Sequence, residues 1–240
     1  MAAGVNHFLF NLALAVIPVV LAITLHEAAH GYAALALGDT TARDAGRLSL
    51  NPIRHIDKVG TIILPGFLLI SQLLVPPHRI FFMFGWAKPV PIGAWKFPNP
   101  RRGMALVASA GPLMNFFLAW LAALVIPVAD TDSATLAVLQ QFLLYFILSN
   151  IVLGLFNLLP IPPLDGGRIA VGLLPESLAR IWARLEKAGI VIVLLVVFIL
   201  PRIIGVDPVG QALDHVLPWA FHTLFWLAGR NVGGMDGNII

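Results

Sequence analysis

An apolar run near the amino terminus ends in three ionisable side chains, and this feature constrains the fold most strongly. Residues 8–25 contain only two polar side chains, Asn11 and Thr24, and lead directly into His26-Glu27-Ala28-Ala29-His30. A run of this length predicts a helix that crosses a membrane. An ionisable group at the centre of such a helix costs about 2.5 kcal/mol or more and is seldom kept without a partner. The motif therefore predicts a functional site inside the membrane.

The spacing of the two histidines predicts a metal site. Residues four apart lie on one face of a helix, so His26 and His30 can direct their imidazoles at one ion, with Glu27 beside it. This HExxH pattern is typical of zinc-dependent proteases, in which the histidines bind zinc and the glutamate is the general base on a zinc-bound water. A catalytic zinc usually has a third protein ligand, which the rest of the chain must supply.

Composition places the chain among integral membrane proteins. Its 240 residues are 59% hydrophobic and 11% charged, and the mean hydropathy is +0.89, far outside the range of a soluble domain. No small-residue cleavage pattern follows the first run, so we expect it to be retained. The absence of cysteine excludes disulfides and thiolate ligands. The pI near 9.7 reflects the topology signal of a membrane protein, so we expect no nucleic-acid partner.

Further apolar runs predict an all-α polytopic membrane protein with about five to six membrane segments. The long runs are residues 104–128 and 136–159, and the shorter ones are 61–75, 188–200 and 209–227. We expect one membrane-embedded domain over residues 1–240, with a core at 8–190 and a helical hairpin at 188–229.

The polar part of the chain is rich in glycine, proline and short alternating stretches. Within residues 38–102 these features predict short β-strands or extended segments. Pro89 and Pro91 suit an edge strand.

The distribution of charge predicts the orientation. Residues 38–102 hold nine Lys or Arg against three Asp, whereas residues 129–135 hold only two Asp and no Lys or Arg. The positive-inside rule places 38–102, and the basic 160–187 loop, in the cytoplasm. We therefore expect a multi-pass protein of the inner (cytoplasmic) membrane, with its site toward the cytoplasmic half. This orientation favours a re-entrant 61–75 segment split at Pro65-Gly66, although its length leaves a full span open.

A break in the apolar pattern supplies the candidate for the third ligand. Residues 157–167, Asn-Leu-Leu-Pro-Ile-Pro-Pro-Leu-Asp-Gly-Gly, end a helix close to the expected depth of the histidines. Irregular backbone at membrane depth is tolerated where it lines a cavity, so Asp165 is the best candidate. The alternative is that Asp165 caps the helix that follows.

These motifs together resemble the site-2 protease family of intramembrane zinc metalloproteases. The resemblance rests on HEAAH, on Asn157-x-x-Pro160-x-x-x-Leu164-Asp165-Gly166, and on Gly111-Pro112-Leu113-Met114-Asn115 between them. Segments near Gly46-Arg47-Leu48 and Gly85-Trp86-Ala87-Lys88-Pro89 resemble the compact prokaryotic branch without PDZ or nucleotide-sensing domains. The resemblance implies that His26, His30 and Asp165 bind one Zn²⁺ per chain and that Glu27 is the base.

Three further side chains remain open to two interpretations. Asn115 and Asn157 could polarise the scissile carbonyl with their NH₂ groups, or form interhelical hydrogen bonds. His55 could hold its loop through hydrogen bonds, or act as a fourth zinc ligand in a resting state that withdraws when substrate binds.

The resemblance implies hydrolysis of peptide bonds in or near transmembrane segments of membrane proteins, as in regulated intramembrane proteolysis. A substrate helix hides its carbonyls, so we expect helix-destabilising residues near the cut, and residues 86–97 could hold the unwound segment by strand addition. The lipid bilayer is the other expected partner, and the oligomeric state is left open. The competing hypothesis is a membrane metal transporter or metal-binding scaffold; in that case Glu27 would be a ligand or relay.

Overall fold

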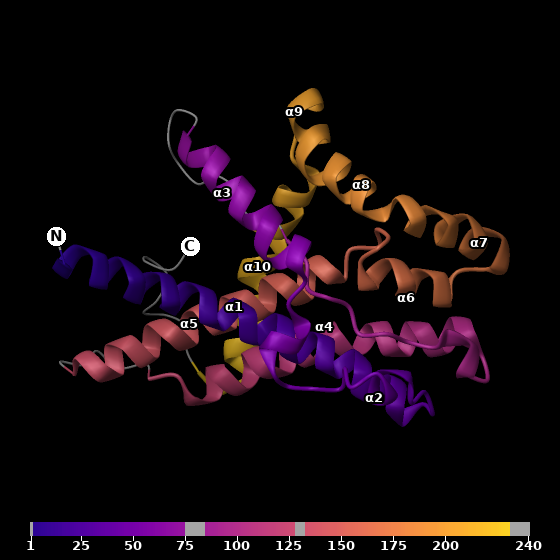
Figure 1. Ribbon diagram of the computed structural model, residues 1–240, viewed down its shortest axis with the longest axis horizontal. Helices are drawn as coiled ribbons and strands as arrows, with labels where there is room; N and C mark the ends of the chain where they lie inside the picture. The colour runs from indigo at the N-terminus through magenta and orange to yellow at the C-terminus, as the bar shows by residue number, and fades with distance from the viewer. Residues whose placement is uncertain (1, 75–84, 128–132, 231–240) are drawn as a thin grey trace.

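The computed structural model describes residues 2–74, 85–127 and 133–230. The described residues are mainly helical and include no β-strand (Figure 1). An all-α fold is therefore confirmed, whereas the short strands expected within 38–102 are not found in its described part. Residues 85–93 have irregular backbone instead. Residues 75–84 and most of the expected 129–135 link lie outside the described ranges.

Three long helices form the centre of the fold. They are α1 (Ala2–Ala36), α4 (Pro100–Val125) and α5 (Ala134–Asn157), and each is long and apolar enough to cross a membrane. The described ranges contain three such helices, so the larger span count is not confirmed. Large apolar side chains on α4, including Leu106, Leu113 and Phe117, are exposed, as expected of a surface that faces lipid.

Small residues bring these helices close together. α4 packs against both α1 and α5, and its buried positions are mostly alanine and glycine, which let helix backbones approach in a membrane. The start of α4 is determined locally, because the Asn99 side chain accepts a hydrogen bond from the Arg102 N–H and Pro100 takes the first helical position.

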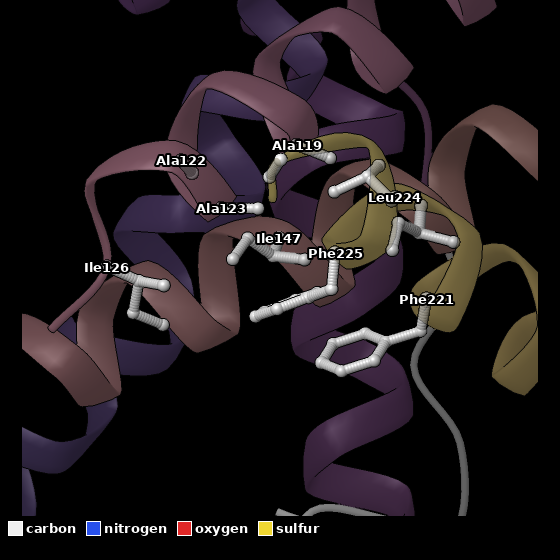
Figure 2. Close-up of a cluster of buried hydrophobic side chains, with 10 residues drawn as sticks. Ala119, Ala122, Ala123, Ile126, Ile147, Phe221, Leu224 and Phe225 are labelled. Atoms are coloured by element: carbon white, nitrogen blue, oxygen red, sulfur yellow. The ribbon is translucent and has the colours of Figure 1, made fainter. Parts of the chain in front are cut away.

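The carboxyl-terminal half of α4 packs in an apolar core with α5 and α10 (Pro208–Leu227) (Figure 2). Phe225 is 1% exposed and stacks on Phe221 with ring centroids 4.5 Å apart. Figure 2 shows Phe225 directed at Ile147 of α5. This core contains no ionisable side chain. A site made of ionisable groups must therefore lie outside it.

A chain of short elements lies between α1 and α4. It comprises α2 (Thr41–Asp44), η1 (Pro52–His55), η2 (Lys58–Ile63), α3 (Leu64–Leu74) and η3 (Ala94–Lys96). η2 and α3 follow one another without a break over residues 58–74, slightly fewer than the roughly 20 residues that a perpendicular span needs. The question of a re-entrant or spanning 61–75 segment stays open.

The chain after α5 folds into further short helices. They are α6 (Asp165–Leu173), α7 (Glu176–Leu185), η4 (Glu186–Ala188), α8 (Gly189–Leu194), η5 (Leu195–Ile199) and α9 (Leu200–Ile204). Gly205 follows with a φ of 68°, a left-handed conformation that glycine adopts without strain. After this turn, α10 returns to α4 and α5 (Figure 1).

Candidate metal centre

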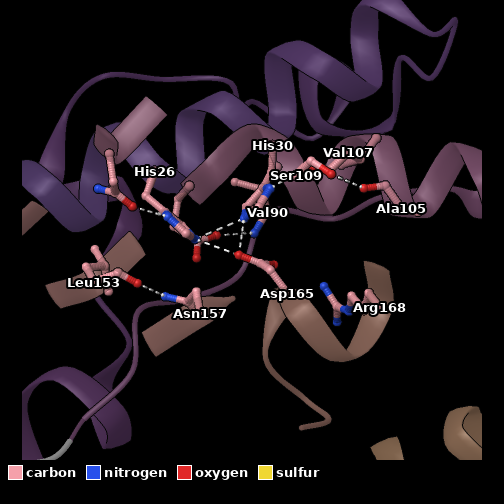
Figure 3. A network of polar contacts seen from close by, with 12 residues as sticks. His26, His30, Val90, Ala105, Val107, Ser109, Leu153, Asn157, Asp165 and Arg168 are labelled. Carbon is pink, nitrogen blue, oxygen red and sulfur yellow. Dashed lines mark hydrogen bonds and ion pairs between the residues drawn. The ribbon is translucent and has the colours of Figure 1, made fainter. Parts of the chain in front are cut away.

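Three ligand-type atoms from α1 and α6 converge at one buried point (Figure 3). The Nε2 atoms of His26 and His30 lie 3.1 Å apart. Oδ2 of Asp165 lies 3.0 Å from the first and 3.3 Å from the second. The three residues are 5%, 7% and 6% exposed, respectively. The structure thus brings together the three residues that the sequence suggested as ligands.

Hydrogen bonds on the far side of each imidazole determine which nitrogen faces the centre as an acceptor. Nδ1 of His30 lies 2.8 Å from the Val107 carbonyl oxygen. Nδ1 of His26 lies 2.6 Å from Oδ1 of Asn115. Both oxygens only accept, so each Nδ1 must donate and each neutral ring presents the lone pair of Nε2 to the centre.

This donor set fits a zinc ion. Two imidazole lone pairs and a carboxylate face one another, and the buried Oδ2 of Asp165 has no hydrogen-bond partner despite its proximity to both rings. A cation between the three atoms would satisfy all of them. Ligands about 2.0–2.1 Å from a tetrahedral zinc stand roughly 3.3 Å apart, which is close to the observed separations. The fourth position of such a site is left for water or substrate.

Gly111 of α4 lies against both imidazoles, close to Nε2 and Cε1 of His26 and Cε1 of His30. A Cβ atom at this position would lie 2.6 Å from ring atoms of both His26 and His30, closer than any unstrained contact. The glycine is therefore required by the close approach of α4 to the histidine face of α1. In the sequence, Gly111 stands out only as part of the Gly-Pro-x-x-Asn motif. The packing of α4 against α1 explains why this position requires a glycine.

A tight turn positions Asp165. The residue opens α6, and no side-chain cap was found at the start of this helix. Leu164 takes the N-cap position, and Oδ2 of Asp165 lies against both imidazoles, which favours the ligand interpretation over a helix cap. The turn depends on Gly166 and Gly167, because Cβ atoms there would lie 2.2 Å from the Leu158 carbonyl oxygen and 2.7 Å from the Pro162 nitrogen.

Glu27 lies beside the three ligand-type residues but is not one of them. Its Oε2 accepts a hydrogen bond of 3.2 Å from the Val90 N–H. Glu27 also lines a cavity of about 440 Å³ that opens beside the centre. The walls of this cavity come from α1, α5, α6, α8 and residues 85–93, called here the irregular segment. They include Ile23, Trp86, Ala87, Pro89, Phe156, Asn157, Arg168 and Val193.

Besides Asp165, α5 and α6 contribute two polar side chains to the cavity wall, Asn157 and Arg168. One N–H of the Asn157 amide donates to the Leu153 carbonyl at 3.0 Å, and the amide nitrogen has a second hydrogen to offer. Arg168 pairs with Glu186 of η4 at 2.8 Å. Figure 3 shows both side chains close to Asp165. Asn157 therefore stays a candidate for contact with a substrate.

Asn115 does not fit the role of a group that polarises a carbonyl. It is fully buried, and its amide nitrogen donates to Oδ1 of Asn150 at 2.8 Å and to the Ala22 carbonyl at 3.3 Å. Both of its hydrogens are used, which matches the second interpretation, interhelical hydrogen bonding, and Asn115 supports His26 at Nδ1. The side-chain pattern of the sequence gives no signal for the Val107 carbonyl.

His55 is not part of the centre in this structure. Its Nε2 donates to the Ser49 carbonyl at 2.7 Å, and the residue is outside the group of ligand-type atoms around His26. The fourth-ligand hypothesis finds no support here. The alternative, a histidine that holds its loop, matches the observed hydrogen bond.

The irregular segment beside the cavity has one bonded edge. The N–H groups of Trp86, Lys88 and Val90 donate to the Gly60 carbonyl, the His55 carbonyl and the Glu27 carboxylate. Alternate residues of an extended chain point their backbone groups to opposite sides. The opposite edge belongs to Ala87, Pro89 and Pro91, whose backbone groups have no hydrogen bond within the described residues.

A buried carboxylate attaches the end of this segment to α1. Oδ2 of Asp39 accepts a 2.6 Å hydrogen bond from the Gly93 N–H, and Oδ1 accepts from Thr41 and lies 3.2 Å from Nζ of Lys96. Burial raises the pKa of Asp39, but the hydrogen bonds from Thr41, Gly93 and Lys96 outweigh it and lower the pKa from 3.8 to about 2. Asp39 is therefore ionised at neutral pH and holds the segment in place.

Comparisons with known proteins show which family the chain belongs to. The model of "Peptidase family M50" matches residues 125–200, a range that includes Asn157 and Asp165. "Putative zinc metalloprotease YwhC" of Bacillus subtilis is 38% identical over 191 residues, which cover 78% of this chain and 80% of that protein. "Putative zinc metalloprotease Rip2" of Mycobacterium tuberculosis is 30% identical over 208 residues, or 85% of this chain and 69% of that protein. No solved structure matches significantly.

Proposed function

The chain belongs to peptidase family M50, and from this premise we propose that it is an intramembrane zinc endopeptidase, which hydrolyses peptide bonds in or near transmembrane segments of membrane proteins. The observation that carries the proposal is the convergence of His26, His30 and Asp165 beside Glu27 and an apolar cavity. Site-2-type regulated proteolysis is the corresponding cellular role. The active site lies toward the cytoplasmic half of the inner membrane.

The histidines and Asp165 would hold the zinc. When bound there, zinc supplies Lewis acidity and lowers the pKa of water toward about 7. Glu27 takes the proton of the attacking water and later delivers it to the leaving amine. The hydrogen bond from the Val90 N–H orients the Glu27 carboxylate for both transfers. The second N–H of Asn157 is available to the scissile carbonyl.

The unbonded edge of the irregular segment is the proposed binding surface for an unwound substrate. Ala87 and Pro89 line the cavity, and proline has no N–H. The edge therefore offers carbonyl acceptors at all three of its residues but a single donor, the Ala87 N–H. A substrate would bind mainly through its own N–H groups. Helix-destabilising residues near the cut would expose those groups.

The test uses fusion proteins with one transmembrane segment between two tags. One carries an all-leucine segment and another a segment interrupted by Gly-Pro, each reconstituted with the purified full chain in vesicles. We expect cleavage of the interrupted segment alone. Glu27→Gln should keep its zinc and lose about 10²–10⁴-fold in rate, while Glu176→Gln, on the exposed face of α7, should be unaffected.

The competing function is metal transport, and Glu27 separates the two. Loss of zinc from Glu27→Gln, with no cleavage by the wild type but zinc flux into vesicles, would contradict the protease proposal. The position of Glu27 outside the ligand set favours the protease.

A further inference from the structure

We infer that Asn150, which touches none of the ligand atoms, is a positioning residue that sets the zinc affinity of His26 through Asn115. This inference rests on the proposed zinc site. It concerns a chain of buried amides that joins α5 to α4 and α4 to α1. Asn115 and Asn150 are each 0% exposed, so no water competes for their hydrogen bonds.

The direction of every hydrogen bond between these amides is determined at the α5 end of the series, where Asn150 contacts Phe146. Nδ2 of Asn150 lies 2.8 Å from the Phe146 carbonyl oxygen. A carbonyl only accepts, so the amide nitrogen must face Phe146 and Oδ1 must face Asn115. Asn115 then donates to this Oδ1 at 2.8 Å, and its own Oδ1 is turned toward His26.

The last hydrogen bond in this series of amides determines the tautomer of His26. Oδ1 of Asn115 accepts from Nδ1 of His26, which leaves the Nε2 lone pair for the metal. His30 obtains the same tautomer from one backbone carbonyl, that of Val107, which cannot rotate. The His26 arrangement depends on a side-chain amide whose oxygen and nitrogen can exchange places.

Loss of the Asn150 oxygen removes the main restraint on that exchange. A rotated Asn115 amide would present its NH₂ group to Nδ1 of His26, and the imidazole proton would move to Nε2, where a metal binds. The remaining acceptor, the Ala22 carbonyl at 3.3 Å, is the longer of the two that hold Asn115. Removing a group that orients a metal ligand typically costs 10–100-fold in affinity.

The experiment is a chelator competition for zinc with the purified full chain in detergent. We expect Asn150→Leu to bind zinc about tenfold more weakly than the wild type. Asn150→Ala repeats the test without added bulk. Asn150→Asp should retain wild-type affinity, because a carboxyl oxygen still accepts from Asn115.

Thr24→Val is the matched control. The Thr24 hydroxyl is buried two residues before His26 and donates to the Val20 carbonyl at 2.7 Å, so this variant also loses one buried hydrogen bond to a helix carbonyl. Its zinc affinity should stay at the wild-type value. If the wild type binds zinc and Asn150→Leu, Asn150→Ala and Thr24→Val all bind it as tightly as the wild type, this inference is overturned and the proposed zinc site is not. A wild type that binds no zinc would contradict the proposed function as well.

Discussion

The Glu27 carboxylate accepts a hydrogen bond from the Val90 N–H at 3.2 Å, so the proposed general base is attached to a segment 63 residues away in sequence. The same segment lines the cavity beside the metal centre, and Ala87 and Pro89 of its unbonded edge are among the lining residues. The base and the proposed substrate surface are therefore positioned together. A displacement of residues 85–93 would disturb both at once.

Gly111→Ala should abolish zinc binding. The added methyl group would lie 2.6 Å from ring atoms of both histidines, so the rings or α4 must move away from the centre. The measurement is zinc content after purification, with Gly66→Ala as the control, because a Cβ at Gly66 has nothing within 4 Å. Full zinc occupancy in Gly111→Ala would show that the helices are not packed as described.

Ala87→Pro should weaken substrate binding without loss of zinc. The substitution removes the single N–H of the unbonded edge, and one hydrogen bond is worth about 0.5–1.5 kcal/mol, which corresponds to a rise of roughly two- to tenfold in KM. Steady-state kinetics on the Gly-Pro fusion protein would measure it. An unchanged KM would count against binding at this edge.

Asp39→Asn should reduce stability in a pH-dependent way. Because the folded-state pKa of Asp39 is lowered from 3.8 to about 2, its contribution is complete well above pH 3.8 and is lost as the pH falls through about 2. The difference in thermal midpoint between wild type and Asp39→Asn should therefore be full at pH 6, shrink as the pH falls below about 4, and be lost below about pH 2. Asp214→Asn, at an exposed position on α10, is the control. A difference as large at pH 2 as at pH 6 would contradict this assignment.

The sequence predicted the parts of the site that depend on local periodicity. His26 and His30 share a face because a helix repeats every 3.6 residues, and Asp165 follows a proline-rich break that can be read directly. Which residue of α4 packs against the histidines depends on tertiary packing, so Gly111 could be found only as a motif. A backbone acceptor such as the Val107 carbonyl leaves no trace in a side-chain pattern.

The expected strands illustrate a different limit. Residues 85–93 have the prolines and alternation of an edge strand, but the N–H groups of Trp86, Lys88 and Val90 bond to single carbonyls of Gly60 and His55 and to the side chain of Glu27. An extended segment without a neighbouring strand forms no sheet. Likewise, an asparagine in a membrane helix is compatible with catalysis or with support, and the actual donors and acceptors around Asn115 separate the two.

Zinc content tests the central claim most directly. Wild type and Glu27→Gln should each carry about one zinc per chain, whereas Asp165→Ala, which lacks one of the three protein ligands that a catalytic zinc usually has, should carry much less. A wild type without zinc, or an Asp165→Ala variant that binds it as tightly as the wild type, would contradict the His26–His30–Asp165 centre.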